Sequence, residues 1–389
     1  MITTEAWVLY ANPEDAERPT RVEDVLRRES FSFPEPDDHE VLVEPLYGSY
    51  EANMDHALTR DPIDVCRQRG EKSTVIGNLG VVRVLRPGPS APTTVREGDV
   101  CMVMPFGRRD RHGYAELVYG YDMPGTVGLM TRRTKVRAEN LLPVPVDSAY
   151  SLPQWAAYAR YFTAWDNWSV AFHCWKAQMR EEHLGDYLVF GWGGGVSVAE
   201  LELARRAGFR VAMTASTDER LAYLRGKGIQ PVDRRLFPDL ARSGHGEDFD
   251  PVADRRYRAS EQEFLRVIAE LSGGAGVAIF IDNIGAPVYK ATLKSLSREG
   301  VVATAGWKGG MNLLNRRATE CIKRHLHVHT HVWRFQDSAR VRDYQEETGW
   351  IADIDPDAIY GFDEIPVLAQ DYRMEKLSTY FPIYQVNPV

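Results

Sequence analysis

Hydrophobic residues in the first 150 positions fall in short runs, alternating or continuous, that proline, glycine and aspartate separate. Such runs are typical of β-strands joined by turns. The runs that predict strands are EAWVLY (5–10), EVLVEPLY (40–47), VIGNLGVVRVL (75–85), DVCMVMP (99–105) and GYAELVYG (113–120). We therefore expect a β-rich N-terminal region that closes at LLPVPVD (141–147).

A helical, aromatic segment follows at 152–180, and from Asp186 strands alternate with helices. This alternation indicates a parallel sheet covered on both faces. The predicted strands are YLVF (187–190), FRVAMTAS (209–216), IQPVDRR (229–235), GVAIFIDNIG (276–285) and VVATAGW (301–307). The predicted helices are VAELELARRAG (198–208), DERLAYLRGKG (218–228), EQEFLRVIAELSGG (261–274) and VYKATLKSLSREG (288–300). The charged residues 236–260 predict a surface loop, and YFPIYQVNPV (380–389) predicts a closing strand.

Composition and charge narrow the function classes. The chain of 389 residues is 44% hydrophobic and 26% charged, as in ordinary globular proteins, and its net charge is −8. The sequence contains no long run of basic residues, so we expect no surface for nucleic-acid binding. The N-terminus lacks the pattern of a secretory signal, and no apolar run is long enough to span a bilayer. The four cysteines are widely separated and predict neither a disulfide framework nor a metal knuckle. We expect a cytoplasmic protein.

A glycine-rich turn, FGWGGGVS (190–197), lies between the first strand of the alternating region and its helix. This arrangement brings backbone N–H groups and the positive end of a helix to one point, which suits a pyrophosphate. Ser197 stands where the dinucleotide fingerprint has its third glycine. Serine departs from that pattern but is small enough for close packing of the helix on the strand. A tight turn without a ligand is the alternative, which the complete strand–helix–strand context disfavours. The predicted cofactor contacts are Gly191, Gly193, Gly194, Gly195 and Val196.

The end of the second strand indicates which dinucleotide binds. NAD-binding proteins usually have an acidic residue there, whereas Ser216 and Thr217 stand here and Arg220 follows one turn into the helix. Hydroxyls beside a guanidinium fit a 2′-phosphate, so we expect NADPH. Asp218 argues against NADPH, although an acid in the first turn of a helix also interacts favourably with the helix dipole. Arg234 either meets the adenosine phosphate end or is simply solvated.

The order and spacing of these features resemble the medium-chain dehydrogenase/reductase superfamily. The resemblance implies an α/β fold, with a GroES-like β-rich catalytic domain (1–155 and 335–389) and a Rossmann-type doubly wound parallel sheet (156–334). The landmarks are Asn53-x-Asp55, VIGNLGVVRVLRPGP, VREGDVCMVMP, HGYAELV, LLPVPVD, TAW (163–165), the glycine turn, GVAIFIDNIG and GVVATAGW.

Zinc-dependent members carry Gly-His-Glu where this chain has Gly77-Asn78-Leu79, and a cysteine near the position of Asn53. Catalytic zinc needs nitrogen or sulfur ligands, so we expect no metal. Among zinc-free members, the chain is similar to the crotonyl-CoA carboxylase/reductases in its insertion after VDRR and in residues 320–344. The carboxylating members have a histidine in the step that here reads DNIG (282–285), and an acidic residue that RRDRHGYAE lacks. Reduction without carboxylation is therefore expected.

The resemblance also assigns site residues. Thr163 would lie beside the nicotinamide, and Asn283, Gly306 and Trp307 would line its other edge. Asn53 would donate a hydrogen bond to a substrate carbonyl or thioester. The structural alternatives are a helix hydroxyl bonded to the main chain for Thr163 and turn roles for the asparagines.

The proton donor is left open. A phenol can protonate an enolate, but buried tyrosines are also common in protein cores. The candidates are Tyr47, Tyr50, Tyr158 and Tyr161, of which Tyr161 is taken as the catalytic residue. Four histidines would share one face of a predicted strand, and such a face could bind a divalent metal. The resemblance instead implies an edge strand, often at the dimer seam, and so favours a structural or interface role. These residues are His325, His327, His329 and His331.

These features predict an NADPH-dependent reductase of an activated carbon–carbon double bond, in an enoyl thioester or an enone. The alternatives are a quinone or ketone reductase and a non-catalytic NADPH-binding module. The basic runs RRDRH (108–112) and TRRTKVR (131–137) are either sites for the phosphates of coenzyme A or solvated faces. The expected partners are a small-molecule or acyl-thioester substrate and a second copy of the chain, with no nucleic acid and no membrane.

Overall fold

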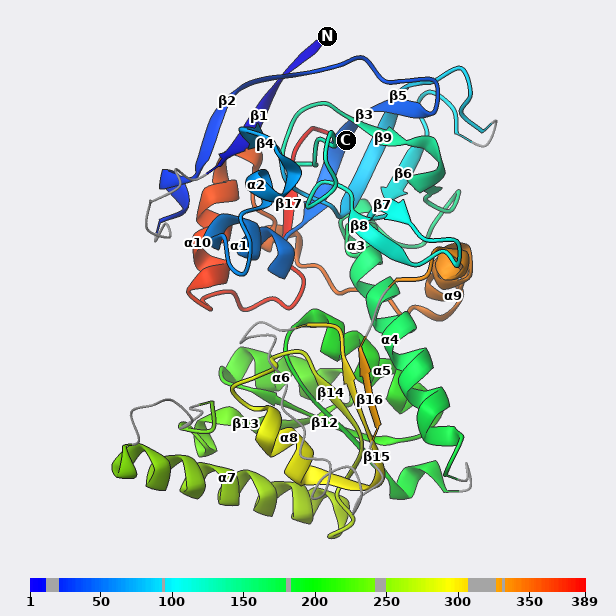
Figure 1. Ribbon diagram of the computed structural model, residues 1–389. Helices are drawn as coiled ribbons and strands as arrows, with labels where there is room; N and C mark the ends of the chain where they lie inside the picture. The colour runs from blue at the N-terminus through cyan, green and yellow to red at the C-terminus, as the bar shows by residue number, and fades with distance from the viewer. Residues whose placement is uncertain (12–20, 93–94, 180–182, 242–249, 307–326, 331–332) are drawn as a thin grey trace. The chain divides into compact units, whose positions relative to one another are not determined.

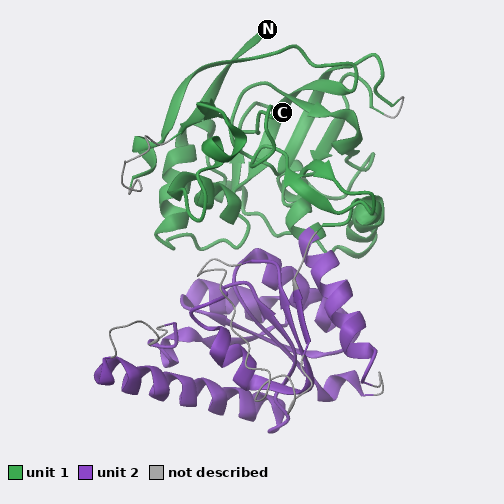
Figure 2. Ribbon diagram, in the orientation of Figure 1, with its two compact units in different colours: residues 1–162, 333–389 green, residues 163–332 purple. Residues whose placement is uncertain are grey.

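The computed structural model describes residues 1–11, 21–92, 95–179, 183–241, 250–306, 327–330 and 333–389. The chain divides into two compact units (Figure 2). Unit 1 comprises residues 1–162 and 333–389, and unit 2 comprises residues 163–332. The C-terminal segment therefore returns to the unit that the N-terminal segment begins.

Unit 1 is built mainly from antiparallel sheets. One sheet has the order β2-β1-β4, a second has the order β10-β6-β5-β3-β17 with β9 also paired to β3, and β7 pairs with β8. The predicted closing strand is confirmed, because β17 pairs with β3 along Ile383↔Ser49. The strands are β1 (Ile2–Tyr10), β2 (Leu26–Phe33), β3 (Glu40–Ser49), β4 (Ser73–Thr74), β5 (Gly80–Pro87), β6 (Val100–Val103), β7 (Phe106–Arg109), β8 (Ala115–Val118), β9 (Thr134–Arg137), β10 (Leu141–Pro143) and β17 (Ile383–Gln385).

The helices of unit 1 are short. Helix α1 packs near α10 and the buried face of β1, in a core that includes Met54, Leu58 and Leu368. The α-helices of this unit are α1 (Ala52–Thr59), α2 (Val65–Arg69), α3 (Leu152–Ala156), α9 (Ser338–Thr348) and α10 (Ile365–Arg373). The longer helix α4 (Tyr158–Lys176) begins in unit 1 and continues into unit 2.

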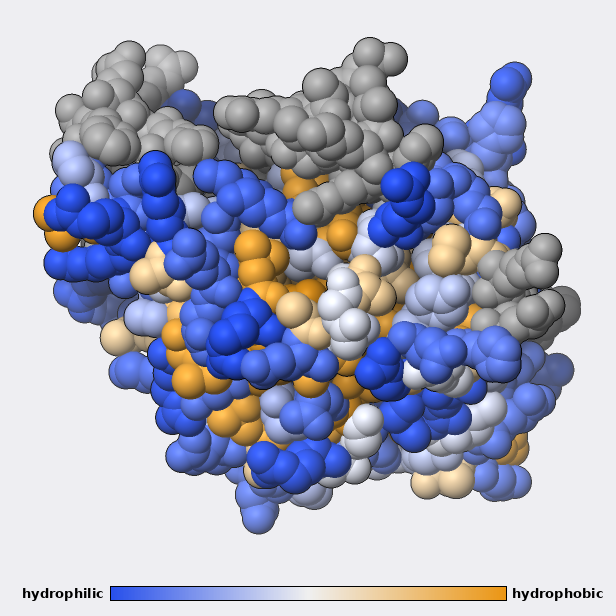
Figure 3. Space-filling view, turned by 90° about the horizontal axis from the view of Figure 1, so that it is seen from below, coloured by the Kyte–Doolittle hydropathy of each residue, from blue (hydrophilic) through white to orange (hydrophobic). Residues whose placement is uncertain are grey.

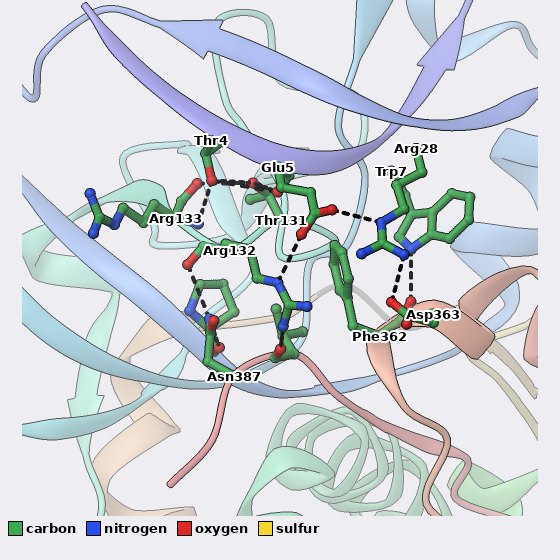
Figure 4. Close-up of polar contacts among 12 residues, drawn as sticks. Thr4, Glu5, Trp7, Arg28, Thr131, Arg132, Arg133, Phe362, Asp363 and Asn387 are labelled. Atoms are coloured by element: carbon green, nitrogen blue, oxygen red, sulfur yellow. Dashed lines mark hydrogen bonds and ion pairs between the residues drawn. The ribbon is translucent and has the colours of Figure 1, made fainter.

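Polar contacts attach the C-terminal segment to β1 (Figure 4). Glu5 accepts from Arg28 at 2.7 Å and from Arg132 at 3.3 Å. The Trp7 indole N–H donates to the carbonyl of Phe362 at 2.8 Å, and the Arg132 guanidinium lies 4.1 Å from the centre of the Phe362 ring. The Asn387 amide donates to the carbonyl of Arg132 at 3.0 Å. Residues far apart in the sequence thus close one side of unit 1.

Unit 2 holds a six-stranded sheet of order β13-β12-β11-β14-β15-β16, in which every pair is parallel. This is the strand order of the doubly wound dinucleotide-binding fold, and helices cover both faces of the sheet (Figure 1). The predicted α/β fold class is confirmed. The elements are β11 (Leu188–Trp192), α5 (Gly195–Ala207), β12 (Arg210–Ala215), α6 (Asp218–Gly226), β13 (Gln230–Asp233), α7 (Pro251–Ser272), β14 (Val277–Asp282), α8 (Tyr289–Ser295), β15 (Leu296–Thr304) and β16 (His327–Thr330).

Alternation along β11 explains how the two faces of this sheet are filled. Phe190 and Trp192 point to one face, where their rings lie 5.7 and 5.1 Å from that of Phe264 on α7. Gly191 faces the other side, where a Cβ atom would lie 3.3 Å from Leu201 of α5. A glycine here lets α5 pack close to the strand.

Three sequence-based assignments need correction. The expected loop over 236–260 is wrong in its second half, because α7 already begins at Pro251, where Asp250 caps the helix by accepting from the backbone N–H of Val252. The expected helix over 288–300 ends at Ser295, and β15 begins at Leu296. Strand β2 was not predicted, because its charged and exposed residues hide the alternation.

Several large apolar side chains are exposed among the described residues. The most exposed large apolar residues of the described ranges are Met1, Val146, Leu236, Val252, Val367, Met374 and Val389. On the face shown in Figure 3, polar residues surround the apolar ones. Across the described residues, no helix combines the length and apolar character needed to cross a membrane.

Candidate functional site

The glycine turn lies at the carboxyl end of β11, where the strand order of the sheet reverses between β12 and β14. Ligands of doubly wound sheets bind at such a switch point. Helix α5 begins at Gly195 after Gly194 as its N-cap, and no side chain caps it. The first N–H groups of a helix have no intrahelical acceptor, so this helix start presents amides and a positive dipole end that suit a pyrophosphate.

Gly193 is required by the local geometry of this turn. Its φ is +133°, a conformation that L side chains rarely adopt. A Cβ atom would lie 2.7 Å from Ser197 Oγ and 2.9 Å from the Cβ of Asn283. The turn therefore has no space for a side chain at this position.

Ser197 uses its hydroxyl within the turn. Its Oγ donates to the carbonyl of Trp192 at 3.1 Å and accepts from the Asn283 amide at 2.8 Å. The serine at the third glycine position thus links the end of β11 to the residue that follows β14.

Asn283 ties together the carboxyl ends of neighbouring strands. Its Oδ1 accepts from the backbone N–H of Ala305 at 2.8 Å and of Gly306 at 3.1 Å, just after β15. Asp282 forms the turn around it by accepting from the N–H groups of Ile284 and Gly285. Predicted site residues Asn283 and Gly306 are therefore adjacent, whereas Trp307 lies outside the described residues.

A buried acid lies beneath this turn. Glu200 on α5 is completely buried, and its Oε2 accepts from the Asn167 amide of α4 at 2.9 Å. Desolvation raises the pKa of Glu200 well above its ordinary value, while Asn167 and Asn283 act to lower it. A carboxyl in such surroundings is held neutral. Glu200 thus connects α4, α5 and the end of β14.

The end of β12 has the polar groups that the sequence predicted there. Thr217 caps α6 by accepting from the N–H of Arg220 at 3.3 Å, and Ser216 directly precedes it. Asp218 stands in the first turn of α6 and forms an ion pair with Arg235 at 2.7 Å. The guanidinium of Arg235 offsets the negative charge of Asp218, which by itself would disfavour a 2′-phosphate at this position. Arg234 is exposed and stays a predicted contact.

The predicted catalytic side chains lie in different surroundings. Thr163 is buried on α4. Tyr161 is completely buried, with its ring 4.8 Å from Trp350 and 5.2 Å from Phe381, as a core residue of unit 1. Tyr158 is also fully buried, and its hydroxyl donates to the carbonyl of Ser338 at 2.6 Å.

Asn53 lies in the first turn of α1, next to an acid that the sequence analysis did not single out. Its side chain lowers the pKa of the Glu51 carboxyl, to which Asn78 Nδ2 donates at 3.0 Å. Asn78 stands in the step that replaces Gly-His-Glu. The buried guanidinium of Arg160 adds a positive charge near Glu51.

Both basic runs proposed for coenzyme A phosphates carry ion pairs within unit 1. Arg108 pairs with Glu116 at 2.7 Å, and Lys135 pairs with Glu40 at 2.7 Å. Further pairs are Arg109 with Glu139, Arg132 with Glu5, and Arg137 with Glu139. These contacts favour the solvated-face interpretation.

His327 and His329 share one face of β16, as their register against Val301 and Ala303 shows. His325 and His331 lie outside the described residues. Among the described residues, no group of histidine, cysteine or acidic side chains has the arrangement of a metal site.

Three polar residues of these surroundings were missed from the sequence: Glu51, Arg160 and Glu200. Arg160 and Glu200 did carry a signal, because each is a charged residue within an apolar helical stretch, YARYF (158–162) and VAELEL (198–203). Charged residues are almost never fully buried without a partner. Glu51 carried no such signal, since it stands at a helix start.

No family model matches the chain. Solved structures do match it over nearly its whole length. They include crotonyl-CoA carboxylase/reductase AntE in complex with NADP (19% identity, TM-score 0.79, 98% of this chain and 94% of that chain). The 2-octenoyl-CoA carboxylase reductase CinF in complex with NADP and 2-octenoyl-CoA matches at 18% identity and a TM-score of 0.79, over 99% of this chain and 88% of that one.

The alcohol dehydrogenase from Aeropyrum pernix is a third match, with 15% identity, a TM-score of 0.73, and 98% and 99% of the two chains covered. The likeness confirms the expected resemblance at the level of the fold. This chain has the fold that crotonyl-CoA carboxylase/reductases share with alcohol dehydrogenases.

Proposed function

We propose that the protein is an NADPH-dependent reductase of an activated carbon–carbon double bond in an enoyl thioester or enone. The observation that carries the proposal is the uncapped start of α5 behind the Gly193 turn, at the switch point of the parallel sheet. The matching AntE and CinF structures hold NADP, and CinF also holds 2-octenoyl-CoA, which supports this cofactor and substrate class.

The chain's own groups fit the parts of this cofactor. The first amides of α5 would hold the pyrophosphate, and Ser216, Thr217 and Arg220 would hold the 2′-phosphate. NADPH supplies a hydride when bound. Thr163, Asn283 and Gly306 would orient the nicotinamide, and Asn53 would hold the substrate carbonyl. We assign no metal, because Gly77-Asn78-Leu79 stands where zinc-dependent enzymes carry Gly-His-Glu, and no carboxylation, because residues 282–285 (DNIG) lack the histidine of the carboxylating enzymes.

A substrate panel tests the proposal. NADPH oxidation is followed by absorbance with crotonyl-CoA and longer enoyl-CoA esters, simple enones, quinones and ketones, each with and without bicarbonate. Turnover of an enoyl substrate to the saturated product, with no added mass from bicarbonate, supports it. Turnover of only quinones or ketones would favour that alternative, and NADPH binding without any turnover would favour a non-catalytic module.

Arg220→Gln is expected to weaken NADPH binding by about tenfold, equivalent to about 1.4 kcal/mol, while NADH binding changes little. The reason is that only NADPH carries the 2′-phosphate that the guanidinium would meet. Fluorescence titration with both cofactors measures the two dissociation constants. Arg225→Gln, at the exposed far end of the same helix, is the matched control. Equal losses for both cofactors would contradict the assignment.

We also propose a homodimer in the cytoplasm, as the resemblance implies. Sedimentation velocity of the full chain measures the oligomeric state, and a monomer at micromolar concentration would contradict the dimer.

A further inference from the structure

Glu51 occupies an unusual position for a glutamate. It is the N-cap residue of α1, yet its side chain makes no capping hydrogen bond with the helix. An N-cap oxygen normally accepts from the second or third amide of its helix. The Glu51 carboxyl instead accepts from the Asn78 amide at 3.0 Å, and the Asn53 side chain is near enough to lower its pKa.

The partners of Glu51 form a preorganised polar cluster in unit 1. Asn78 is completely buried, and its Oδ1 has no hydrogen-bond partner within the described residues. Arg160, on α4, is buried and donates to the carbonyl of Tyr50 at 3.4 Å. An ordinary helix start requires none of these polar groups, and burying them without function costs stability.

Glu51 keeps part of its surface exposed. The residue is half-buried, whereas the completely buried Glu200 and Tyr161 have no exposed surface for substrate. Its neighbour Asn53 is the group expected to hold the substrate carbonyl. A proton donor to the α-carbon must lie close to that carbonyl, and Glu51 is an acid whose pKa the nearby Asn53 side chain lowers.

We propose that Glu51 is the general acid of the reaction and delivers a proton to the α-carbon of the reduced substrate. The inference rests on the proposed reductase function. A hydride forms the new C–H bond at the β-carbon, and the electron pair of the double bond moves onto the thioester or ketone as an enolate. The enolate then forms an α-C–H bond with the proton of the Glu51 carboxyl, which is left as a carboxylate and regains a proton from water.

The electrostatics of the cluster suit this role. Burial is the largest influence and raises the pKa of Glu51, while Asn78, Arg160 and Asn53 oppose it. The phenol of Tyr121 also senses the Glu51 charge, which raises the pKa of that phenol. A raised pKa keeps the acid protonated closer to neutral pH, and Arg160 stabilises the carboxylate that protonation of substrate leaves behind.

Glu51→Gln is the central test, since glutamine keeps the shape and the acceptor for Asn78 but carries no transferable proton. With an enoyl substrate that wild type reduces, kcat is expected to fall about 100-fold, while KM and NADPH affinity stay within about twofold. In D₂O, wild type is expected to deuterate the α-carbon on one face, and the variant on both faces.

Glu51→Asp and a pH profile separate catalysis from folding. The wild-type rate is expected to fall at alkaline pH as the acid loses its proton, and this limb should persist in Glu51→Asp and disappear in Glu51→Gln. In cofactor-free protein at a pH below this limb, the infrared C=O absorption of protonated carboxyls should weaken in Glu51→Gln by the contribution of Glu51, while the contribution of Glu200 remains. Glu116→Gln, an exposed acid of β8, is the control expected to match wild type.

The outcomes distinguish the two proposals. If wild type reduces no enoyl substrate, the proposed function fails. If wild type does so and Glu51→Gln keeps its rate, its stereochemistry and its alkaline limb, the assignment of Glu51 alone is overturned. If Glu51→Gln does not fold, a Glu51→Asp variant with the wild-type rate and no alkaline limb would also overturn it.

Discussion

Replacing Gly193 by alanine is expected to weaken NADPH binding by about 10- to 100-fold. A side chain would have to adopt φ near +133° and would place its Cβ 2.9 Å from the Cβ of Asn283. Such strain costs about 1–3 kcal/mol, and 1.4 kcal/mol is a tenfold change in affinity. Relief of the strain would move the start of α5 away from the position that binds pyrophosphate.

Fluorescence titration of the variant with NADPH, together with a thermal unfolding curve, measures both consequences. Gly226→Ala is the matched control, because a Cβ there meets nothing within 4 Å and no positive φ is required. It is expected to leave affinity unchanged and to alter stability by less than about 1 kcal/mol. Wild-type affinity in Gly193→Ala would show that the turn does not hold the cofactor.

Replacing Glu200 is expected to change the free energy of unfolding by an amount that depends on pH. Glu200→Ala is expected to lower the free energy of unfolding by about 3 kcal/mol at pH 5, because it leaves a void and removes the acceptor for Asn167. Glu200→Gln keeps the shape and a neutral acceptor, so we expect it to cost less than about 1 kcal/mol at that pH.

The pH dependence follows from the direction of the pKa shift. The carboxyl of the unfolded chain ionises near pH 4.5, and burial raises the pKa in the folded protein. The folded state therefore holds the proton that the unfolded state releases, and stability falls by about 1.4 kcal/mol per pH unit above pH 4.5 until the folded pKa is reached. Glu200→Gln lacks this loss and should become more stable than wild type as pH rises.

Urea unfolding of both proteins from pH 5 to pH 8 measures the difference. Glu219→Gln, on the exposed side of α6, is the control and should follow the wild-type curve at every pH. A constant difference between wild type and Glu200→Gln across this range would mean that Glu200 is already ionised in the folded protein.

The order of elements in unit 2 was predictable because each signal lies within a few consecutive residues. Continuous apolar runs gave β11, β12 and β14, and Gly208 ends α5 in the left-handed conformation that favours glycine. The glycine turn, and the group of Ser216, Thr217 and Arg220 after β12, are likewise each formed by a few nearly consecutive residues. The start of α7 also had a local signal, the Asp250-Pro251 cap, within a charged stretch that obscured it.

The polar clusters were decided by the tertiary structure. Glu51, Asn78 and Arg160 come from a helix start, a connection between strands and a long helix, separated by up to 109 positions in the chain. Asn167, Glu200 and Asn283 are similarly distant in sequence and meet only because α4, α5 and β14 pack together. The burial of these side chains, and with it the pKa of Glu51 and of Glu200, depends on that packing.

The sequence by itself determined the α/β class, the parallel sheet with its glycine turn and the expected preference for NADPH, because backbone geometry, helix capping and side-chain periodicity are properties of neighbouring residues. Only the tertiary structure decided that Tyr161 is a core residue and that the Asn78 amide holds Glu51. Desolvation and hydrogen bonding between distant segments set these properties, and neither is visible in local sequence.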